Sequence, residues 1–102
     1  MAPFPIAWSL PARADFMEVS AWWAANRPLA PTLLRDELVS SMRLLRDHPE
    51  AGARVRAAGR GVRRLVLTRS RYLLLYRVDT RTRRLIVLAL WHPSRGSPPP
   101  LR

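Results

Sequence analysis

The sequence predicts a small α+β domain in which a helical hairpin packs on one face of a four-stranded antiparallel sheet, in the order β-α-α-β-β-β. Three apolar segments of strand length follow one another in the second half of the chain: Val62–Thr68, Tyr72–Asp79 and Arg84–Trp91. Apolar runs of four to eight residues between turn signals are typical of strands. The first half instead carries two apolar patterns of helical period. We therefore expect one domain over residues 1–96 and a proline-rich tail over 97–102.

The first elements can be placed from proline and from apolar spacing. Pro5–Ser9 can form a short first strand, with its proline at the start, where a missing N–H is tolerated. A helix then begins at Leu10, because Pro11 suits the first turn. It ends at Asn26, ahead of Pro28. Its apolar stripe recurs at helical spacing: Ala12, Phe16, Val19 and Trp23.

A second helix begins at Ala30 or Pro31 and ends before His48 and Pro49. Its apolar stripe consists of Leu34, Leu38, Met42 and Leu45. Because few residues join the two helices, we expect them to form an antiparallel hairpin. Glu50–Arg60 then reads as a loop that contains glycine and arginine, but no strand precedes it and no helix follows it. The context of a phosphate-binding P-loop is therefore missing.

Alternation along the strands assigns their side chains to two faces. Arg77 is costly to bury unpaired, so its face should be the open one, together with Leu73 and Leu75. The face toward the helices then carries Tyr72, Leu74, Tyr76 and Val78. The strand before it contributes Leu65 and Leu67 to the same face. The open face also receives Arg64, Val66 and Thr68. The last strand is apolar on both sides, so its outward side needs a cover, either another chain or a partner peptide.

Charge divides the chain into two halves. All 18 basic residues are arginine, and the formal net charge is +11. Only five of these arginines, with six acids, occur through Glu50, whereas thirteen occur after it with Asp79 as the single acid. Such asymmetry indicates a nucleic acid or a strongly acidic protein as a partner.

Cysteine is absent and only two histidines occur, so we expect no disulfide, no metal site and no cofactor. The N-terminus lacks the basic region of a signal peptide. The longest apolar run, Leu85–Trp91, is far shorter than the ~20 residues that span a bilayer. We therefore expect a cytoplasmic protein that does not contact a membrane.

Five segments in this order resemble the RelE/ParE superfamily of bacterial toxins, which belong to type II toxin–antitoxin modules. Ala7–Asp15 is similar to the family's helix entry W-S-x-x-A-x-x-D, and Leu44–Gly52 to its turn L-x-x-x-P-x-x-G. Val62–Leu67 and Arg71–Val78 resemble its strands R-x-L and Y-R-I-x-Y-x-V. Leu88–Arg95 resembles the closing L-x-V-x-H-x-x-R. The resemblance covers about residues 5–96 and rests on order and spacing, since each motif is short.

The resemblance implies a cognate antitoxin that wraps the toxin as a hetero-oligomer, and it leaves two activities open. RelE-like members cleave mRNA on the ribosome, and for that activity Arg64, His92 and Arg95 are the catalytic candidates. ParE-like members poison DNA gyrase and have no established hydrolytic site. The family pattern carries an arginine where this chain has Leu73, and Val66 is also apolar, so the ParE-like branch is favoured.

Further residues are candidates for contact with the target or with the antitoxin: Arg71, Leu73, Leu75, Arg77 and Trp22. Whether the chain is an enzyme stays open at this point. Two other hypotheses are a non-toxic basic nucleic-acid-binding module and a toxin that has lost its activity. The module hypothesis is weakened because few aromatic residues alternate with basic ones on the open face.

Overall fold

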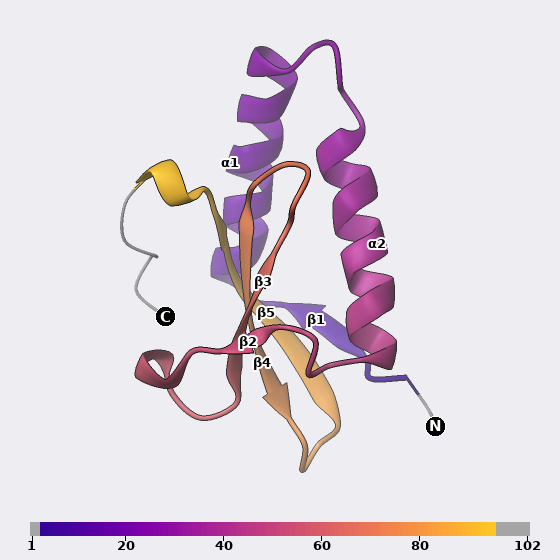
Figure 1. The fold of residues 1–102 in the computed structure, drawn as a ribbon, viewed down its shortest axis with the longest axis vertical. Helices are drawn as coiled ribbons and strands as arrows, with labels where there is room; N and C mark the ends of the chain where they lie inside the picture. The colour runs from indigo at the N-terminus through magenta and orange to yellow at the C-terminus, as the bar shows by residue number, and fades with distance from the viewer. Residues whose placement is uncertain (1–2, 96–102) are drawn as a thin grey trace.

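Two helices and a five-stranded sheet form two layers in the computed structural model, which describes residues 3–95 (Figure 1). Helices α1 (Leu10–Asn26) and α2 (Leu33–Asp47) form an antiparallel hairpin that covers one face of the sheet. Within the described residues, no helix combines the length and the apolar character that crossing a membrane requires. The proline-rich tail expected over 97–102 lies outside the described residues.

The sheet has the strand order β1-β5-β4-β3-β2. Its strands are β1 (Ile6–Trp8), β2 (Ala53–Arg54), β3 (Val62–Val66), β4 (Leu73–Asp79) and β5 (Arg84–Trp91). The predicted order of elements is confirmed. Two details differ, because β1 pairs with β5 in parallel and β2 adds a fifth strand within the segment expected to be a loop.

Local chemistry explains where the helices begin. Ser9 caps α1, since its hydroxyl accepts a hydrogen bond from the Ala12 amide at 3.2 Å. Helix α2 starts at Leu33, two or three residues later than expected. The indole of Trp23 donates to the Ala30 carbonyl at 2.8 Å, and this carbonyl also accepts from the Leu33 amide at 3.3 Å. The residues before Leu33 therefore form turns rather than a helical turn of α2.

The helix-side core contains the apolar stripes of both helices and the inward residues of the sheet. Tyr76, Leu74 and Leu45 are fully buried there. The predicted inward orientation of these β4 residues is therefore confirmed, and so is the burial of Trp23. Helix α2 also holds the β3–β4 turn, because the Glu37 carboxylate accepts from the amides of Arg69 and Ser70 at 2.7 and 2.8 Å.

A β-bulge in β5 explains why alternation could not assign this strand. Tyr76 pairs with Val87 and Leu75 pairs with Ala89, so Leu88 is an extra residue between the two pairs. Leu88 and Ala89 consequently both pack in the outer cluster, whereas Val87 on one side and Leu90 on the other belong to the helix-side core. The strand is apolar on both faces because it contributes to two clusters.

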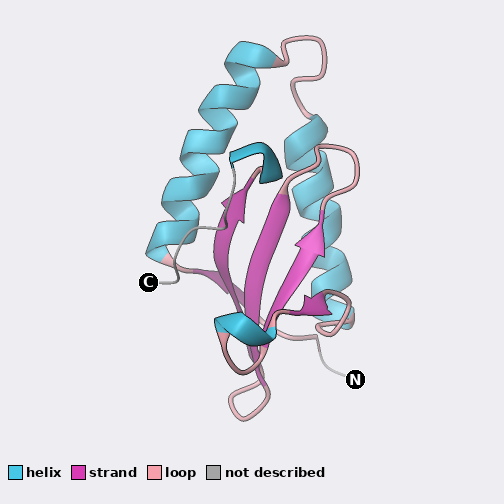
Figure 2. Ribbon diagram, turned by 60° about the vertical axis from the view of Figure 1, so that its left-hand side comes forward, coloured by secondary structure: helices cyan, strands magenta, loops and turns pink. Residues whose placement is uncertain are grey.

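The outer sheet face, opposite the helices, is covered over part of its length, which corrects the expectation of an open face. Val62, Leu75, Ala89 and Trp91 are buried in an outer cluster, and Leu75 is only 3% exposed. Val55 and Ala58 pack against it. They belong to the segment that carries β2 and the short 3₁₀ helix η1 (Arg56–Ala58), which Figure 2 shows in front of the sheet. The cover comes from the chain itself, through a segment without a readable hydrophobic pattern.

Candidate functional site

Apolar side chains lie opposite Arg64 and beside it toward the β3–β4 turn, on the outer sheet face. Arg64 lies opposite Leu75 in the β3–β4 ladder, and the next outward pair toward the turn is Val66 with Leu73. Leu73 in turn pairs with Trp91 of β5. Toward the turn, the neighbouring positions of the ladder therefore add no positive charge to Arg64, whereas the outward pair on the other side, Val62 with Arg77, adds one arginine. We call Arg64, Val66, Leu73 and Trp91 the turn-end surface.

His92 directly follows Trp91 at the end of β5, and its ring lies beside the helix-side core. Its ring meets the ring of Tyr72 edge-on, with the centroids 5.2 Å apart. The Ser94 amide donates to His92 Nδ1 at 3.1 Å, and Ser94 Oγ lies 2.8 Å from the same nitrogen. These contacts of the imidazole are with Tyr72 and Ser94, and none of them is with Arg64. Arg95 ends the short helix η2 (Pro93–Arg95), and its side chain lies outside the described part of the molecule.

The remaining predicted contact residues lie on three separate elements. Arg71 is exposed in the β3–β4 turn, with a φ of 67°. Arg77 is exposed on β4. Trp22 is 38% exposed on α1, and the guanidinium of Arg27 lies 5.6 Å from its ring centroid. No single surface unites these three side chains, and their contact roles stay predictions.

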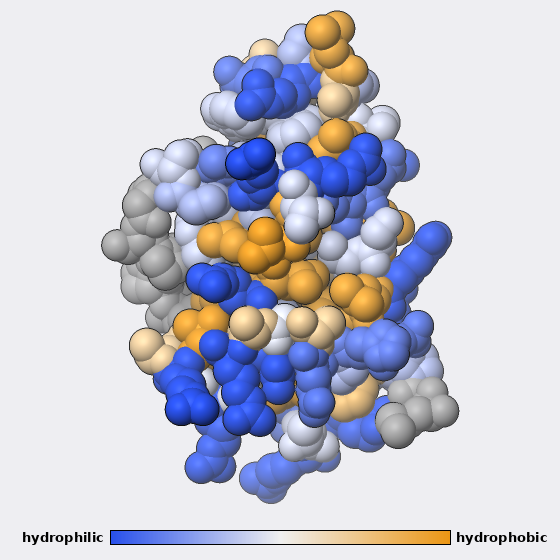
Figure 3. All heavy atoms as spheres, viewed as in Figure 1, coloured by the Kyte–Doolittle hydropathy of each residue, from blue (hydrophilic) through white to orange (hydrophobic). Residues whose placement is uncertain are grey.

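Apolar and hydrophilic side chains occupy different parts of the surface that Figure 3 shows. An apolar area lies near the middle, and hydrophilic side chains gather below it, over η1 and the β4–β5 turn. Val66 is 52% exposed and Leu44 of α2 is 41% exposed, and both line a shallow hollow of about 260 Å³ between α2 and β3. The turn-end surface is thus continuous with an exposed apolar area.

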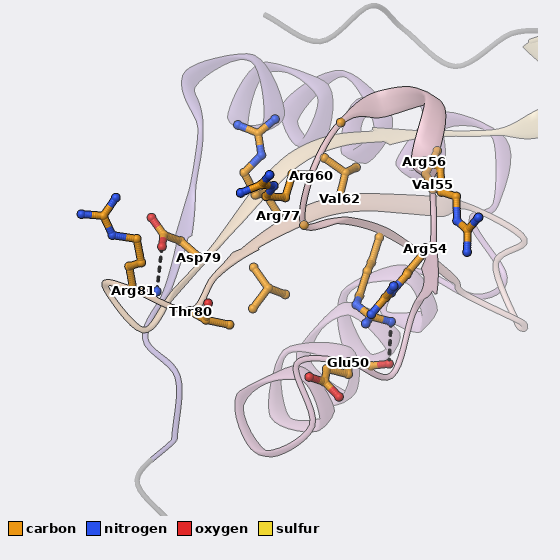
Figure 4. A pocket seen from close by; sticks show the side chains of 14 residues that line it. Glu50, Arg54, Val55, Arg56, Arg60, Val62, Arg77, Asp79, Thr80 and Arg81 are labelled. Carbon is orange, nitrogen blue, oxygen red and sulfur yellow. Dashed lines mark hydrogen bonds between the residues drawn. The ribbon is translucent and has the colours of Figure 1, made fainter.

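A second, larger hollow of about 860 Å³ lies at the opposite end of β3 (Figure 4). The segment from β2 to the start of β3 forms one wall, and the end of β4 with the following turn forms the other. Six arginines line it, against two carboxylates: Arg54, Arg56, Arg60, Arg63, Arg77 and Arg81 face Glu50 and Asp79. We call this hollow the arginine groove.

Hydrogen bonds fix the loop that leads into this groove. The Gly52 amide donates to Tyr76 Oη at 2.8 Å, and the same hydroxyl donates to the Pro49 carbonyl at 2.8 Å. Arg63 Nη1 donates to the carbonyls of Gly52 and Glu50 at 2.8 and 3.2 Å. Burial raises the pKa of Tyr76 above its ordinary value of 10.0, against the lowering effect of the Gly52 hydrogen bond.

The raised pKa of Tyr76 predicts a loss of stability at high pH. A group whose pKa is higher in the folded than in the unfolded state stabilises the fold fully below 10.0, and this contribution is lost as pH rises through the folded pKa. At pH 7 we expect Tyr76→Phe to be less stable by about 1–3 kcal/mol, because the Gly52 amide loses its buried acceptor. Urea unfolding should show that the difference in free energy of unfolding between the parent and Tyr76→Phe is smaller at about pH 11 than at pH 7. A difference that widens would contradict this assignment.

Sequence reasoning identified neither the groove nor five of its six arginines: Arg54, Arg56, Arg60, Arg63 and Arg81. The usable signal was the density of arginine and glycine between Gly52 and Gly61. This density suggests a phosphate-binding loop, but the sequence lacks the strand and helix that flank a P-loop. The actual context is a two-residue strand, a 3₁₀ turn and a sheet edge. Within residues 3–95, no three His, Asp or Glu side chains gather as metal ligands would.

A helical hairpin on one face of a sheet, with a basic groove and an apolar turn end on the other, defines a small α+β protein with a surface built for binding rather than a metal site among its described residues. The family model described as "ParE toxin of type II toxin-antitoxin system, parDE" matches residues 6–96. The chain therefore belongs to the ParE toxin family.

Two solved structures share the fold. One is described as the chromosomal ParDE TA system from P. aeruginosa, with a TM-score of 0.69, 20% identity, and coverage of 87% of this chain and 95% of that chain. The other is a mutant of the E. coli toxin RelE in the free state, with a TM-score of 0.56, 18% identity, and coverage of 94% and 88%. At these identities the likeness shows the fold alone. No curated protein matches the sequence significantly.

Proposed function

We propose that this protein is a growth-inhibiting toxin of the cytoplasm that binds DNA gyrase and is neutralised by a cognate antitoxin. Membership of the ParE toxin family over residues 6–96 supports the toxin role. The similar structure described as a ParDE system supports an antitoxin partner. The choice of gyrase over the ribosome rests on the side chains of the outer face.

The observation that carries this choice is the apolar end of the sheet beside Arg64, toward the β3–β4 turn. Cleavage of an RNA phosphodiester needs cations that stabilise the charge developing on the phosphate, and a side chain that moves a proton. Arg64 instead has Leu75 opposite it, with Val66 and Leu73 in the outward pair toward the turn. Arg77 is the single arginine in the outward pair on the other side. His92 packs against Tyr72 and bonds to Ser94. These features favour a surface that binds a protein over a catalytic site.

The antitoxin is proposed to cover the turn-end surface and the adjoining hollow. Val66 and Leu44 expose apolar surface there, and an amphipathic segment would remove it from water. Arg71 and Leu73 border the same end of the sheet and remain candidate contacts. Leu75 supports this surface from beneath, because the chain itself already buries its side chain.

Pulse labelling after induction of the gene without its antitoxin tests the proposed target. We expect thymidine incorporation to fall before methionine incorporation, because DNA synthesis depends directly on gyrase. The purified protein should also inhibit supercoiling by gyrase. If methionine incorporation falls first, the ribosome is the target and the proposal is wrong. If neither falls, the chain is an inactive toxin or a non-toxic nucleic-acid-binding module.

A triple variant separates gyrase inhibition from the ribosome-dependent mRNA endonuclease. The variant carries Arg64→Ala, His92→Ala and Arg95→Ala, all at or beyond the turn end of the sheet. We expect arrest of DNA synthesis to persist in this variant. Loss of mRNA cleavage in the triple variant, with an unchanged thermal melt, would instead identify the endonuclease.

A further inference from the structure

We propose that the arginine groove is a second binding site, which holds the phosphodiester backbone of a nucleic-acid duplex without reading its sequence. The groove lies at the Val62 end of β3, whereas the turn-end surface lies at the Val66 end of the same strand. The inference holds whether or not gyrase is the target, because it rests on a different set of side chains.

Most cations of the groove are available to a ligand. Arg63 is engaged by the carbonyls of Glu50 and Gly52. Four further guanidiniums form no hydrogen bond or ion pair with the described part of the chain: those of Arg54, Arg56, Arg60 and Arg77. Unpaired guanidiniums at a concave surface attract an anion strongly.

The acids of the groove do not cancel this charge. Asp79 Oδ1 accepts hydrogen bonds from the amides of Arg81 and Thr82 at 3.0 and 3.3 Å. These hydrogen bonds, with that of Thr82 first, lower the pKa of the Asp79 carboxyl. The charge of Arg81 also lowers this pKa, to a smaller extent. Figure 4 shows the Arg81 side chain beside Asp79 and directed away from the groove, so Asp79 and Arg81 are both outside the set of charges that a groove ligand meets. Glu50 is exposed at the other end.

The backbone of the groove is held in one arrangement. The Val78 amide donates to the Gly61 carbonyl at 2.9 Å, and the Val55 amide donates to the Val62 carbonyl at 3.0 Å. A Cβ on Gly61 would lie 2.7 Å from the Val78 carbonyl oxygen, so glycine is what allows the two walls to meet. Gly59 has a φ of 111°, a backbone conformation that L side chains rarely adopt, so glycine also fixes this turn of the wall. The arginines therefore project from a pre-organised frame.

The lining favours a phosphate backbone over an acidic protein. Protein interfaces depend on apolar or aromatic anchors that enter pockets, but none of the large exposed apolar side chains lines this groove. Val62 is 2% exposed and already belongs to the outer cluster. Aromatic side chains for stacking unpaired bases are also absent among its lining residues. Positive charge alone matches an evenly charged duplex backbone, and guanidinium forks suit phosphate oxygens.

Fluorescence anisotropy with a DNA duplex of about 20 base pairs, roughly two helical turns, tests the proposal. With up to four phosphate contacts, we expect log affinity to fall with log salt at a slope of about −4. This corresponds to a loss on the order of a few hundred-fold between about 50 and 200 mM salt. An RNA duplex measured in parallel distinguishes DNA from RNA as the source of the backbone.

Two charge-matched double variants decide whether the groove is the site. Arg60→Gln with Arg77→Gln removes two groove cations, and Arg35→Gln with Arg43→Gln removes two exposed cations from α2. We expect the groove variant to bind at least about tenfold more weakly and to lower the salt slope by about 2, while the α2 variant keeps the slope. Thermal melts of both variants control for folding.

Equal losses in the two double variants would overturn the proposal, because they would indicate diffuse attraction by net charge. Absence of salt-dependent binding to either duplex would also overturn it. Displacement of the duplex by short polyglutamate at equal charge concentration, with tighter binding of that peptide, would assign the groove to an acidic protein instead.

Discussion

Leu75→Asp is expected to unfold the domain. Leu75 is 3% exposed and packs in the outer cluster with Val62 and Trp91. Truncating a buried leucine removes about 2–5 kcal/mol, and an unpaired buried carboxylate adds several kcal/mol. Domains have a total stability of about 5–15 kcal/mol. Circular dichroism and thermal melting of the purified variant should show no cooperative transition at neutral pH.

Val66→Asp is the matched control for this prediction. Val66 lies on the same face one outward pair away, but it is 52% exposed, so a carboxylate there stays in water. We expect this variant to fold with a melting temperature within a few degrees of the parent, and to lose binding to the antitoxin. A cooperative melt for Leu75→Asp would show that the segment carrying Val55 and Ala58 does not cover the face.

Gly52→Ala is expected to lower the free energy of unfolding by about 3 kcal/mol. A Cβ at this position would lie 2.7 Å from the Arg64 carbonyl oxygen and 2.7 Å from Tyr76 Oη. One contact is backbone of β3 and the other is a buried hydroxyl held by two hydrogen bonds, so neither can move freely. A loss of this size corresponds to roughly 10–20 °C in melting temperature for a domain of this length.

Ala51→Ser provides the control for Gly52→Ala, because Ala51 is the exposed neighbour of this glycine. A surface substitution of this kind changes stability by less than about 0.5 kcal/mol. The two variants are compared by thermal melting and urea unfolding. If Gly52→Ala melts with the parent, the loop is not clamped between β3 and Tyr76.

The hydrogen bonds of Tyr76 to Gly52 and Pro49, which we call the loop clamp, matter for function because the loop that they hold connects the two ends of the outer face. The Gly52 amide is held by Tyr76 of β4, and the chain then passes through β2 and η1 to the arginine groove. The same segment buries Leu75, whose neighbour across the ladder is Arg64. One short segment therefore sets both the cationic end of the face and the apolar end proposed for the antitoxin.

Helices and long strands were readable from the sequence because their patterns are local. The outer elements were not, because β2 has two exposed residues and η1 has three residues. Neither length supports a hydrophobic period. The bulge at Leu88 was also unreadable, since it is defined by a partner strand rather than by β5 itself.

The amino-acid order by itself determined the α+β class, the helical hairpin, the three long strands, the inward tyrosines and the basic second half. Each of these follows from periodicity or from charge counted along the chain. Only the tertiary structure decided that Leu75 is covered, that His92 packs against Tyr72, and that arginines from β2, η1 and β4 line one groove. These features arise where segments distant in sequence meet. Such contacts depend on the pairing of β2 with the edge of the sheet and on the hydrogen bonds of Tyr76 to Gly52 and Pro49, and no local sequence pattern encodes them.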